Sequence, residues 1–238
     1  MVRGPSDRVA HLMEPQPISR TYRFVMAACA PIVRWWGRLE VEGAEHVPVS
    51  GPLLIVANHD SQWDPVAIGI AGRKRRQIRA LAKASLWDIP GLAPILRGMG
   101  QIPIQRGAAD AGALDEAIRQ LRGGACIGVF PEGTISRGAV LRARSGLGRL
   151  AHAVPEATIV SATVTGTVDI VRFPKRPRIS VTFFPPAEGG VREGEDAADL
   201  PVRLLAEIRT LAPIAQSGRR RKAAANEAKV RAGAGPPA

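Results

Sequence analysis

The sequence predicts a single α/β domain, with a mostly parallel or mixed central sheet flanked by helices. Short apolar runs alternate with segments of helical period along the chain, which is the pattern of such folds. The 238 residues suffice for one large domain, and hydrophobic residues make up 45% of them. Aromatic residues account for only 4%, so aliphatic side chains must fill the core.

The N-terminal part of the chain divides into two segments. Residues 1–17 are polar and contain prolines, and we expect them to be disordered. A helix is predicted over residues 18–37, where the apolar run 24–33 lies between Arg23 and Arg34 and precedes two tryptophans. This run is too short to span a bilayer, and its flanks are typical of a helix lying in the membrane interface. The alternative is a helix docked on the domain's own core.

One folded domain is expected over residues 38–215. Apolar and β-branched runs predict its strands at 39–42, 53–57, 78–82, 101–104, 125–129, 159–165 and 179–184. Helical periodicity predicts helices at 65–71, 86–96, 111–122, 141–154 and 200–211. Pro65 suits a first helical turn, and Asp110 and Asp199 are candidate helix caps.

The chain is strongly basic, with a net charge of +12. Part of the excess lies in residues 216–238, a tail without periodicity that we expect to be disordered. Such a balance suits an anionic membrane, phosphorylated small molecules or nucleic acid. The sequence contains no nucleic-acid motif and few aromatic stacking platforms, which makes a nucleic-acid partner unlikely. Two cysteines give neither a disulfide framework nor a metal-binding spacing.

A histidine and an aspartate follow the predicted strand 53–57 in the segment Asn58-His59-Asp60-Ser61-Gln62-Trp63-Asp64. Histidine is the natural general base near neutral pH, and it needs a partner that fixes its tautomer. A carboxylate five residues downstream can be that partner if the chain turns into a helix. Ser61 has no nucleophile elbow around it. We therefore predict direct attack by an acceptor hydroxyl that His59 activates; the alternative is a solvated loop pair.

A second polar segment follows the predicted strand 125–129 and reads Phe-Pro-Glu-Gly-Thr-Ile-Ser-Arg over residues 130–137. Its backbone N–H groups can hold an oxyanion or a phosphate. Arg137 and Arg106 are candidates for bidentate phosphate binding, although Arg106 taken alone could equally be a surface arginine. Both polar segments leave buried strands at the place where α/β folds build their sites.

Taken together, these segments resemble the glycerolipid acyltransferase superfamily. The run from Asn58 to Asp64 is similar to its NHxxxxD motif, and the run from Phe130 to Thr134 is similar to its FPEGT motif. The block Gly100–Arg106 resembles the stretch between the two motifs. The resemblance covers about residues 39–186, and the size and layout are most like the lysophosphatidic acid (1-acylglycerol-3-phosphate) acyltransferases. Further similar positions are Lys83, Ser145-Gly146 and Gly166-Thr167.

The resemblance implies roles for individual residues. His59 would be the base, Asp64 its orienting partner, and Arg106 the contact to the acceptor phosphate. The remaining implied substrate contacts are Lys83, Glu132, Gly133, Thr134, Ser136 and Arg137. Two positions depart from the pattern. Ile135 replaces a residue that is commonly basic, and a run that usually centres on a proline reads Ile159-Val160-Ser161-Ala162.

The resemblance also implies an enzyme that transfers an acyl group to the free hydroxyl of lysophosphatidic acid, giving phosphatidic acid. The acyl donor would be acyl-CoA or acyl carrier protein, with no metal or other cofactor. We expect a peripheral or monotopic protein at the cytoplasmic face of an anionic membrane. The alternatives are another lysophospholipid or lipid alcohol as acceptor, or a basic binding module without catalysis. The basic loop 73–76 is a candidate contact for the donor or for lipid, or else a solvated turn.

Overall fold

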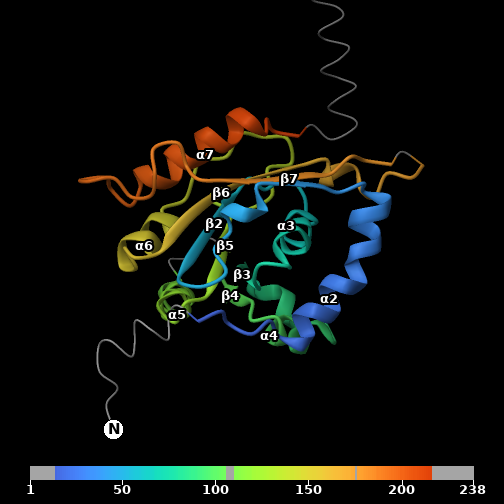
Figure 1. Cartoon of the computed structure of the whole chain (residues 1–238), viewed down its shortest axis with the longest axis horizontal. Helices are drawn as coiled ribbons and strands as arrows, with labels where there is room; N and C mark the ends of the chain where they lie inside the picture. The colour runs from blue at the N-terminus through green and yellow to red at the C-terminus, as the bar shows by residue number, and fades with distance from the viewer. Residues whose placement is uncertain (1–13, 106–109, 175, 216–238) are drawn as a thin grey trace, which may run out of the picture.

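The structure, a computed structural model, describes residues 14–105, 110–174 and 176–215 (Figure 1). Most of the N-terminal segment 1–17, the basic tail 216–238 and Arg106 therefore lie outside the described residues. Within these ranges the chain forms one α/β domain with a mixed central sheet and helices on both faces, which confirms the predicted fold class.

Seven strands make up the sheet in the described part of the chain, in the order β1-β7-β6-β2-β5-β3-β4. Neighbouring strands run parallel except for β6 and β7, which are antiparallel. The strands are β1 Glu40–Glu42, β2 Leu53–Ala57, β3 Ile78–Lys83, β4 Ile102–Ile104, β5 Cys126–Val129, β6 Thr158–Thr165 and β7 Ser180–Phe184.

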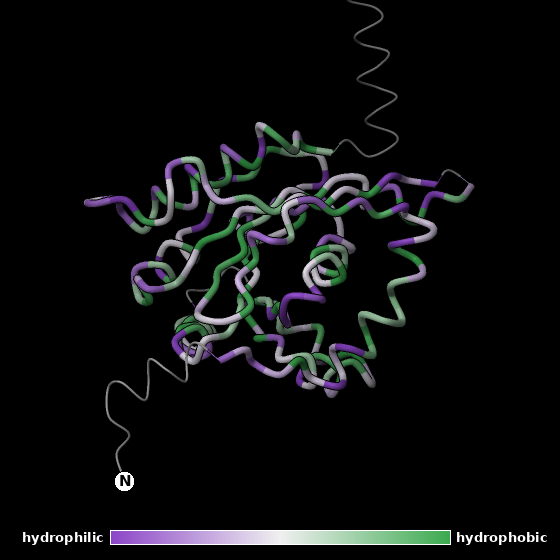
Figure 2. The backbone as a smooth tube through the Cα atoms, in the orientation of Figure 1, coloured by the Kyte–Doolittle hydropathy of each residue, from purple (hydrophilic) through white to green (hydrophobic). Residues whose placement is uncertain are grey.

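The central strand β2 shows how the sequence builds a two-sided core. All five of its residues are buried. Alternate side chains of a strand point to opposite faces. Leu53 and Ile55 accordingly pack in one hydrophobic cluster, and Leu54 and Val56 in the other. Figure 2 shows hydrophobic residues gathered along the central strands and hydrophilic ones concentrated in the outer loops.

Helices cover both faces of the sheet (Figure 1). On the face of the first cluster lie α2 Arg20–Ala30 and α3 Asp64–Gly72, with α4 Leu92–Gly98 beside α2. On the other face lie α5 Ala111–Arg122, α6 Gly146–Ala153 and α7 Asp199–Leu211. The strand–helix alternation read from the sequence therefore places the helices as expected.

The N-terminal helix docks on the domain by one side only. Tyr22 and Met26 are buried in the first hydrophobic cluster, whereas Phe24 is 74% exposed. The helix begins after Ser19, whose hydroxyl accepts a hydrogen bond from the backbone N–H of Tyr22, and it continues as a π-helical stretch, Pro31–Trp36. The segment thus combines a docked face with an exposed apolar one. In the described ranges no helix is both long and apolar enough to cross a membrane.

Three predicted elements differ from the observed ones. The predicted helix 86–96 is divided into a 3-10 helix, Ala84–Asp88, and α4, because Gly91 adopts a left-handed conformation between them. The predicted helix 141–154 begins only at Gly146. Asp199 is not a cap: it lies in the first turn of α7, where its negative charge still suits the helix dipole. By contrast, Asp110 caps α5 through the N–H of Ala113, as predicted.

The parallel strands bring the predicted site segments to one edge of the sheet. The loops after β2, β5 and β6 all leave from the carboxyl ends of parallel neighbours. The basic loop 73–76 lies at the opposite edge. Arg76 is buried there and donates hydrogen bonds to the carbonyl oxygens of Gly51 and Gly124, next to the first residues of β2 and β5. Arg75 likewise donates to the carbonyl oxygen of Val47. These two arginines therefore stabilise the fold, while the suggested contact of the loop with an acyl donor or with lipid stays a prediction.

Candidate active site

The loop after β2 brings His59 against Asp64. The Nδ1 atom of His59 lies 3.1 Å from a carboxylate oxygen of Asp64. The imidazole also stacks on the ring of Phe130, with ring centroids 4.3 Å apart. An Nδ1–H donated to Asp64 leaves Nε2 as the nitrogen that can take a proton from a hydroxyl. Structurally, the two residues form the oriented pair that a general base requires.

Asp64 is fixed by more than the histidine. It is fully buried at the start of α3, where the positive end of the helix dipole favours a carboxylate. The same oxygen that contacts His59 accepts the backbone N–H groups of Asp60 and Ser61, at 2.6 and 2.7 Å. The hydroxyl of Thr167 donates to the other oxygen. A carboxylate held from several directions cannot swing away, so the imidazole keeps one orientation.

Two further polar side chains, Asn58 and Thr167, hold the segments around this pair in place. Asn58 exchanges two 2.8 Å hydrogen bonds with the backbone of Val164, which ties the His59 loop to the end of β6. Thr167 follows Gly166, which has a φ of 80°. A Cβ atom on Gly166 would lie 2.0 Å from the carbonyl oxygen of Arg178. A glycine is therefore required at position 166, and the turn that it allows places the Thr167 hydroxyl against Asp64.

Glu132 belongs to a buried charge network. One of its oxygens accepts the backbone N–H of His59 at 2.7 Å, and the other accepts from Arg209 at 2.5 Å. Burial raises the pKa of Glu132 against the opposing effect of Arg209. Arg209 also binds both carboxylate oxygens of Asp60, at 2.8 and 2.9 Å. Burial opposes ionisation of Asp60, but hydrogen bonds from Arg209 and Ser136 outweigh it and keep the pKa of Asp60 below its ordinary value.

The turn after β5 places its residues in two groups. Ser136 is buried and donates its hydroxyl to Asp60, while its N–H donates to the carbonyl oxygen of His59 at 2.8 Å. Ser136 and Glu132 therefore hold the His59 loop with their side chains. Thr134 and Arg137 are exposed, and Gly133 has a φ of 69°. Their predicted contacts with substrate, like those of Glu132 and Ser136, stay predictions.

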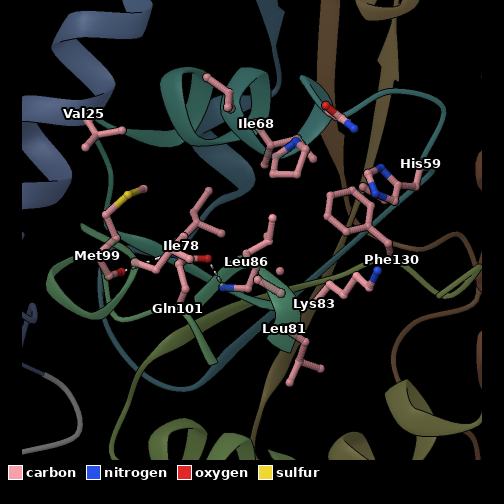
Figure 3. Close-up of a pocket in the computed structure, with 18 of the residues that line it drawn as sticks. Val25, His59, Ile68, Ile78, Leu81, Lys83, Leu86, Met99, Gln101 and Phe130 are labelled. Carbon is pink, nitrogen blue, oxygen red and sulfur yellow. Dashed lines mark hydrogen bonds between the residues drawn. The ribbon is translucent and has the colours of Figure 1, made fainter. Parts of the chain in front are cut away.

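A large apolar cavity runs from His59 into the domain. It has a volume of about 500 Å³, within the usual range for ligand sites. Figure 3 shows His59, Phe130 and Lys83 together at one end, and Val25 and Met99 at the opposite end. Lys83, the last residue of β3, is exposed and adds a positive charge to the lining of the cavity. Aliphatic side chains from α2, α3, β3 and α4 form most of the remaining wall.

The structure brings together His59, Asp64, Lys83 and the turn 130–137, but Arg106 lies outside the described residues. Reasoning from the sequence missed Arg209. One signal was available, because Arg209 follows Leu205 by four residues and therefore lies on the buried stripe of α7, where a charge needs a partner. In the part of the chain described here, no group of three or more His, Cys, Asp or Glu side chains is arranged to hold a metal ion.

The chain is similar to known acyltransferases in sequence. A 1-acyl-sn-glycerol-3-phosphate acyltransferase from Borreliella burgdorferi is 36% identical over 118 residues, which cover 48% of this chain and 46% of that protein. The protein of the same name from Bacillus subtilis is 27% identical over 132 residues, 52% of this chain and 66% of the relative. The chain thus spans about half of the first relative and somewhat under two thirds of the second.

The fold is also similar to that of a solved structure. The crystal structure of the 1-acyl-sn-glycerophosphate (LPA) acyltransferase, PlsC, from Thermotoga maritima matches with a TM-score of 0.56 and 21% identity, covering 79% of each chain. This likeness shows a shared fold. The sequence profile of the Acyltransferase family matches residues 38–165, which include both polar segments and the strands that carry them. The chain therefore belongs to the Acyltransferase family.

Proposed function

We propose that this protein is an enzyme that acylates the free hydroxyl of lysophosphatidic acid and yields phosphatidic acid. The single observation that carries the proposal is the oriented His59–Asp64 pair at the end of a large apolar cavity. Membership of the Acyltransferase family and the names of the sequence relatives support the same reaction. The donor is an acyl thioester, either acyl-CoA or acyl carrier protein.

The reaction follows from the geometry of the pair. Nε2 of His59 takes the proton of the acceptor hydroxyl, and the oxygen attacks the thioester carbonyl carbon. Asp64 stabilises the imidazolium that forms. When the tetrahedral intermediate collapses, the carbon–sulfur bond breaks and the thiolate takes the proton from the imidazolium. The products are an ester and a free thiol, and His59 returns to its neutral form without a metal or other cofactor.

The cavity supplies the lipid specificity in this proposal. Its aliphatic wall suits a hydrocarbon chain, because burying apolar surface is favourable by roughly 25 cal/mol per Å². Lys83 at its mouth, together with Arg106 and Arg137 of the sequence motifs, supplies positive charge for the phosphate of the acceptor or donor. The cavity thus offers an apolar wall for the hydrocarbon chain and, at Lys83, positive charge for a phosphate.

We further propose that the protein lies peripherally or monotopically at the cytoplasmic face of an anionic membrane. Phe24 and Trp35 on the N-terminal segment are 74% and 76% exposed, and Phe173 in the loop between β6 and β7 is 84% exposed. Phe173 stacks on Trp36, with ring centroids 5.8 Å apart. The end of the segment and the loop thus form one exposed aromatic surface near the carboxyl edge of the sheet, and this surface and Phe24 suit insertion into lipid.

An acyl-transfer assay tests the function. Purified protein receives acyl-CoA or acyl carrier protein as donor, and lysophosphatidic acid, other lysophospholipids or a long-chain alcohol as acceptor. We expect the highest kcat/KM with lysophosphatidic acid. A preference for another acceptor would move the protein to a different acceptor class within the family, for which Ile135 is the favouring observation. No transfer with any pair would leave a binding module without catalysis.

A further inference from the structure

Helix α7 lies beyond the residues that match the family profile, yet it reaches the candidate active site. Arg209 in its last turn donates to both carboxylate oxygens of Asp60 and to one of Glu132. Asp60 directly follows His59 in the chain. Glu132 accepts the N–H of His59 with its other oxygen. One guanidinium therefore joins the two loops that form the site.

We propose that Arg209 is a positioning residue for the His59 base. It clamps Asp60 and Glu132 together, and through them it holds the His59 loop in the orientation that the Asp64 contact requires. The inference rests on the proposed function for its kinetic part. Its structural part concerns His59 alone and can be measured without substrate.

The first argument is geometric. The side chains of Arg209, Asp60 and Glu132 are only 14%, 4% and 1% exposed. Without the guanidinium, two buried carboxylates would face each other without a cation between them. Their mutual repulsion would push them apart. Because Glu132 accepts the backbone N–H of His59, that movement displaces the histidine.

The second argument is electrostatic. Among the described residues, the charged groups around His59 include Asp64 on α3, Asp60 in its own loop, Glu132 after β5, Arg209 on α7 and Lys83 at the end of β3. Removing Arg209 leaves more negative charge near the imidazole. Negative charge favours the protonated ring. The neutral, base-competent form of His59 is then populated only at higher pH, so the acid limb of the pH–rate profile moves to higher pH.

The test compares three variants. Arg209→Met removes the charge while keeping most of the side-chain volume. Arg209→Lys keeps the charge, but an ammonium cannot bind two carboxylates in the same forked way. Arg203→Met is the matched control: it removes another partly buried ion pair from the same helix, the one between Arg203 and Glu195 at 2.7 Å, which does not touch the site.

Two readouts are taken from each variant that circular dichroism shows to be folded. The first is kcat and KM for donor and acceptor across pH. The second is the titration of the His59 imidazole by NMR, with the signal identified by its loss in His59→Gln. For Arg209→Met we expect kcat to fall about 10²-fold, the effect of misplacing a reacting group, with little change in KM and a titration midpoint at higher pH. Arg209→Lys should lose part of kcat with little change in the midpoint.

Several results would overturn the proposal. A folded Arg209→Met protein with wild-type kcat and an unchanged His59 titration would do so. So would an equal kcat loss in Arg203→Met, which would mean that general destabilisation explains the effect. A rise in KM alone would make Arg209 a substrate contact. If Arg209→Met does not fold, Arg209→Lys decides, because wild-type kcat in that variant would show that the clamp is not needed.

The NMR readout separates this inference from the proposed function. If the wild-type protein transfers no acyl group to lysophosphatidic acid, the proposed function fails. The His59 titration in Arg209→Met still tests the positioning role in that case. A shifted midpoint without acyl transfer would support the clamp in a protein of different activity.

Discussion

At the scale of the residue, His59 depends on a carboxylate that is itself held in place. Asp64 accepts hydrogen bonds from the backbone of Asp60 and Ser61 and from Thr167, besides its contact with the imidazole. An amide at position 64 would present an NH₂ group as well as an oxygen. It could not satisfy the same set of donors on both sides. The orientation and the tautomer of His59 therefore depend on the negative charge of Asp64.

We expect His59→Ala to reduce acyl transfer by roughly 10²–10⁴-fold, the usual contribution of a general base. Asp64→Asn should lose a comparable factor because the imidazole is held in the wrong tautomer. Single-turnover kinetics with a matched melting curve provide the measurement. A His59→Ala protein that keeps more than about a tenth of the wild-type rate would contradict this role.

Arg106 carries the prediction for the acceptor phosphate. Arg106→Ala should raise the acceptor KM and lower kcat/KM by roughly 10- to 150-fold, because a hydrogen bond to a charged group contributes about 1.5–3 kcal/mol. The donor KM should change little. The comparison is an acceptor that lacks a phosphate. Equal loss with both acceptors would mean that Arg106 stabilises the structure and does not bind the phosphate.

At the scale of the element, α7 does more than cover the sheet. Its buried residues Leu200, Leu204 and Ile208 pack in the second hydrophobic cluster. Its two inward arginines each hold a loop. Arg209 reaches the active-site loops, and Arg203 binds Glu195 and the carbonyl oxygen of Gly190. The helix thus links the edge of the sheet that carries His59 to the segment that precedes α7 in the sequence.

The ion pair between Arg203 and Glu195 predicts a pH-dependent stability. The hydrogen bonds that Arg203 donates to the Glu195 carboxylate lower the pKa of Glu195 from 4.5 to about 2. A carboxyl group with a depressed pKa in the folded state stabilises the fold fully above its unfolded pKa and loses that contribution as pH falls through the folded value. We expect Arg203→Met to reduce the free energy of unfolding at pH 6, with a difference from wild type that shrinks steadily below the unfolded value of 4.5.

Urea unfolding of both proteins over this pH range measures the difference. An Arg203→Met penalty that stays constant from pH 6 to pH 3 would mean that the side chain stabilises the loop by packing and by its bonds to backbone carbonyls. The ion pair would then contribute nothing measurable.

At the scale of the whole molecule, the exposed aromatic surface around Trp36 lies near the edge of the sheet that carries His59. Trp36 donates a 2.8 Å hydrogen bond to the carbonyl oxygen of Ile170, close after Thr167, which contacts Asp64. A membrane that took up Trp35 and Phe173 would therefore lie near the His59 loop.

We expect Phe24→Ser, Trp35→Ser and Phe173→Ser each to weaken binding to anionic vesicles by about tenfold, since burying a large apolar side chain contributes roughly 1.5–3 kcal/mol. Co-sedimentation with vesicles measures it. Val202→Ser is the control, because Val202 is 52% exposed on α7 and away from this surface. Full-length protein that does not bind anionic vesicles would refute the membrane assignment without touching the His59 mechanism.

Point substitutions are needed because the N-terminal helix is part of the core. Tyr22 and Met26 are buried, and a Cβ atom on Gly69 of α3 would lie 2.8 Å from the sulfur of Met26. Removing the first 37 residues would expose the first hydrophobic cluster. We therefore expect such a truncation to aggregate, with a loss of cooperative unfolding in calorimetry.

The sequence by itself determined the domain class and the contact between His59 and Asp64. Buried runs such as 53–57 alternate with helices of clear period, as in Ala111–Arg122 with its Asp110 cap, and these signals are local. The contact between His59 and Asp64 could be predicted for the same reason, because the two residues are only five positions apart and a helix begins at Asp64. The predicted helix boundaries were wrong where one glycine or one loop decided them, as at Gly91 and before Gly146.

Only the tertiary structure decided which side chains share the site. Arg209 lies 77 residues after Glu132 in sequence, and the packing of α7 on the sheet brings the two within hydrogen-bonding distance. Other long-range contacts hold Glu132 and Ser136 against the His59 loop, and they place Arg75 and Arg76 at the edge away from His59. The physical reason is that burial and charge pairing depend on neighbours from distant segments. A local pattern identifies a reactive residue, and the fold decides what that residue contacts.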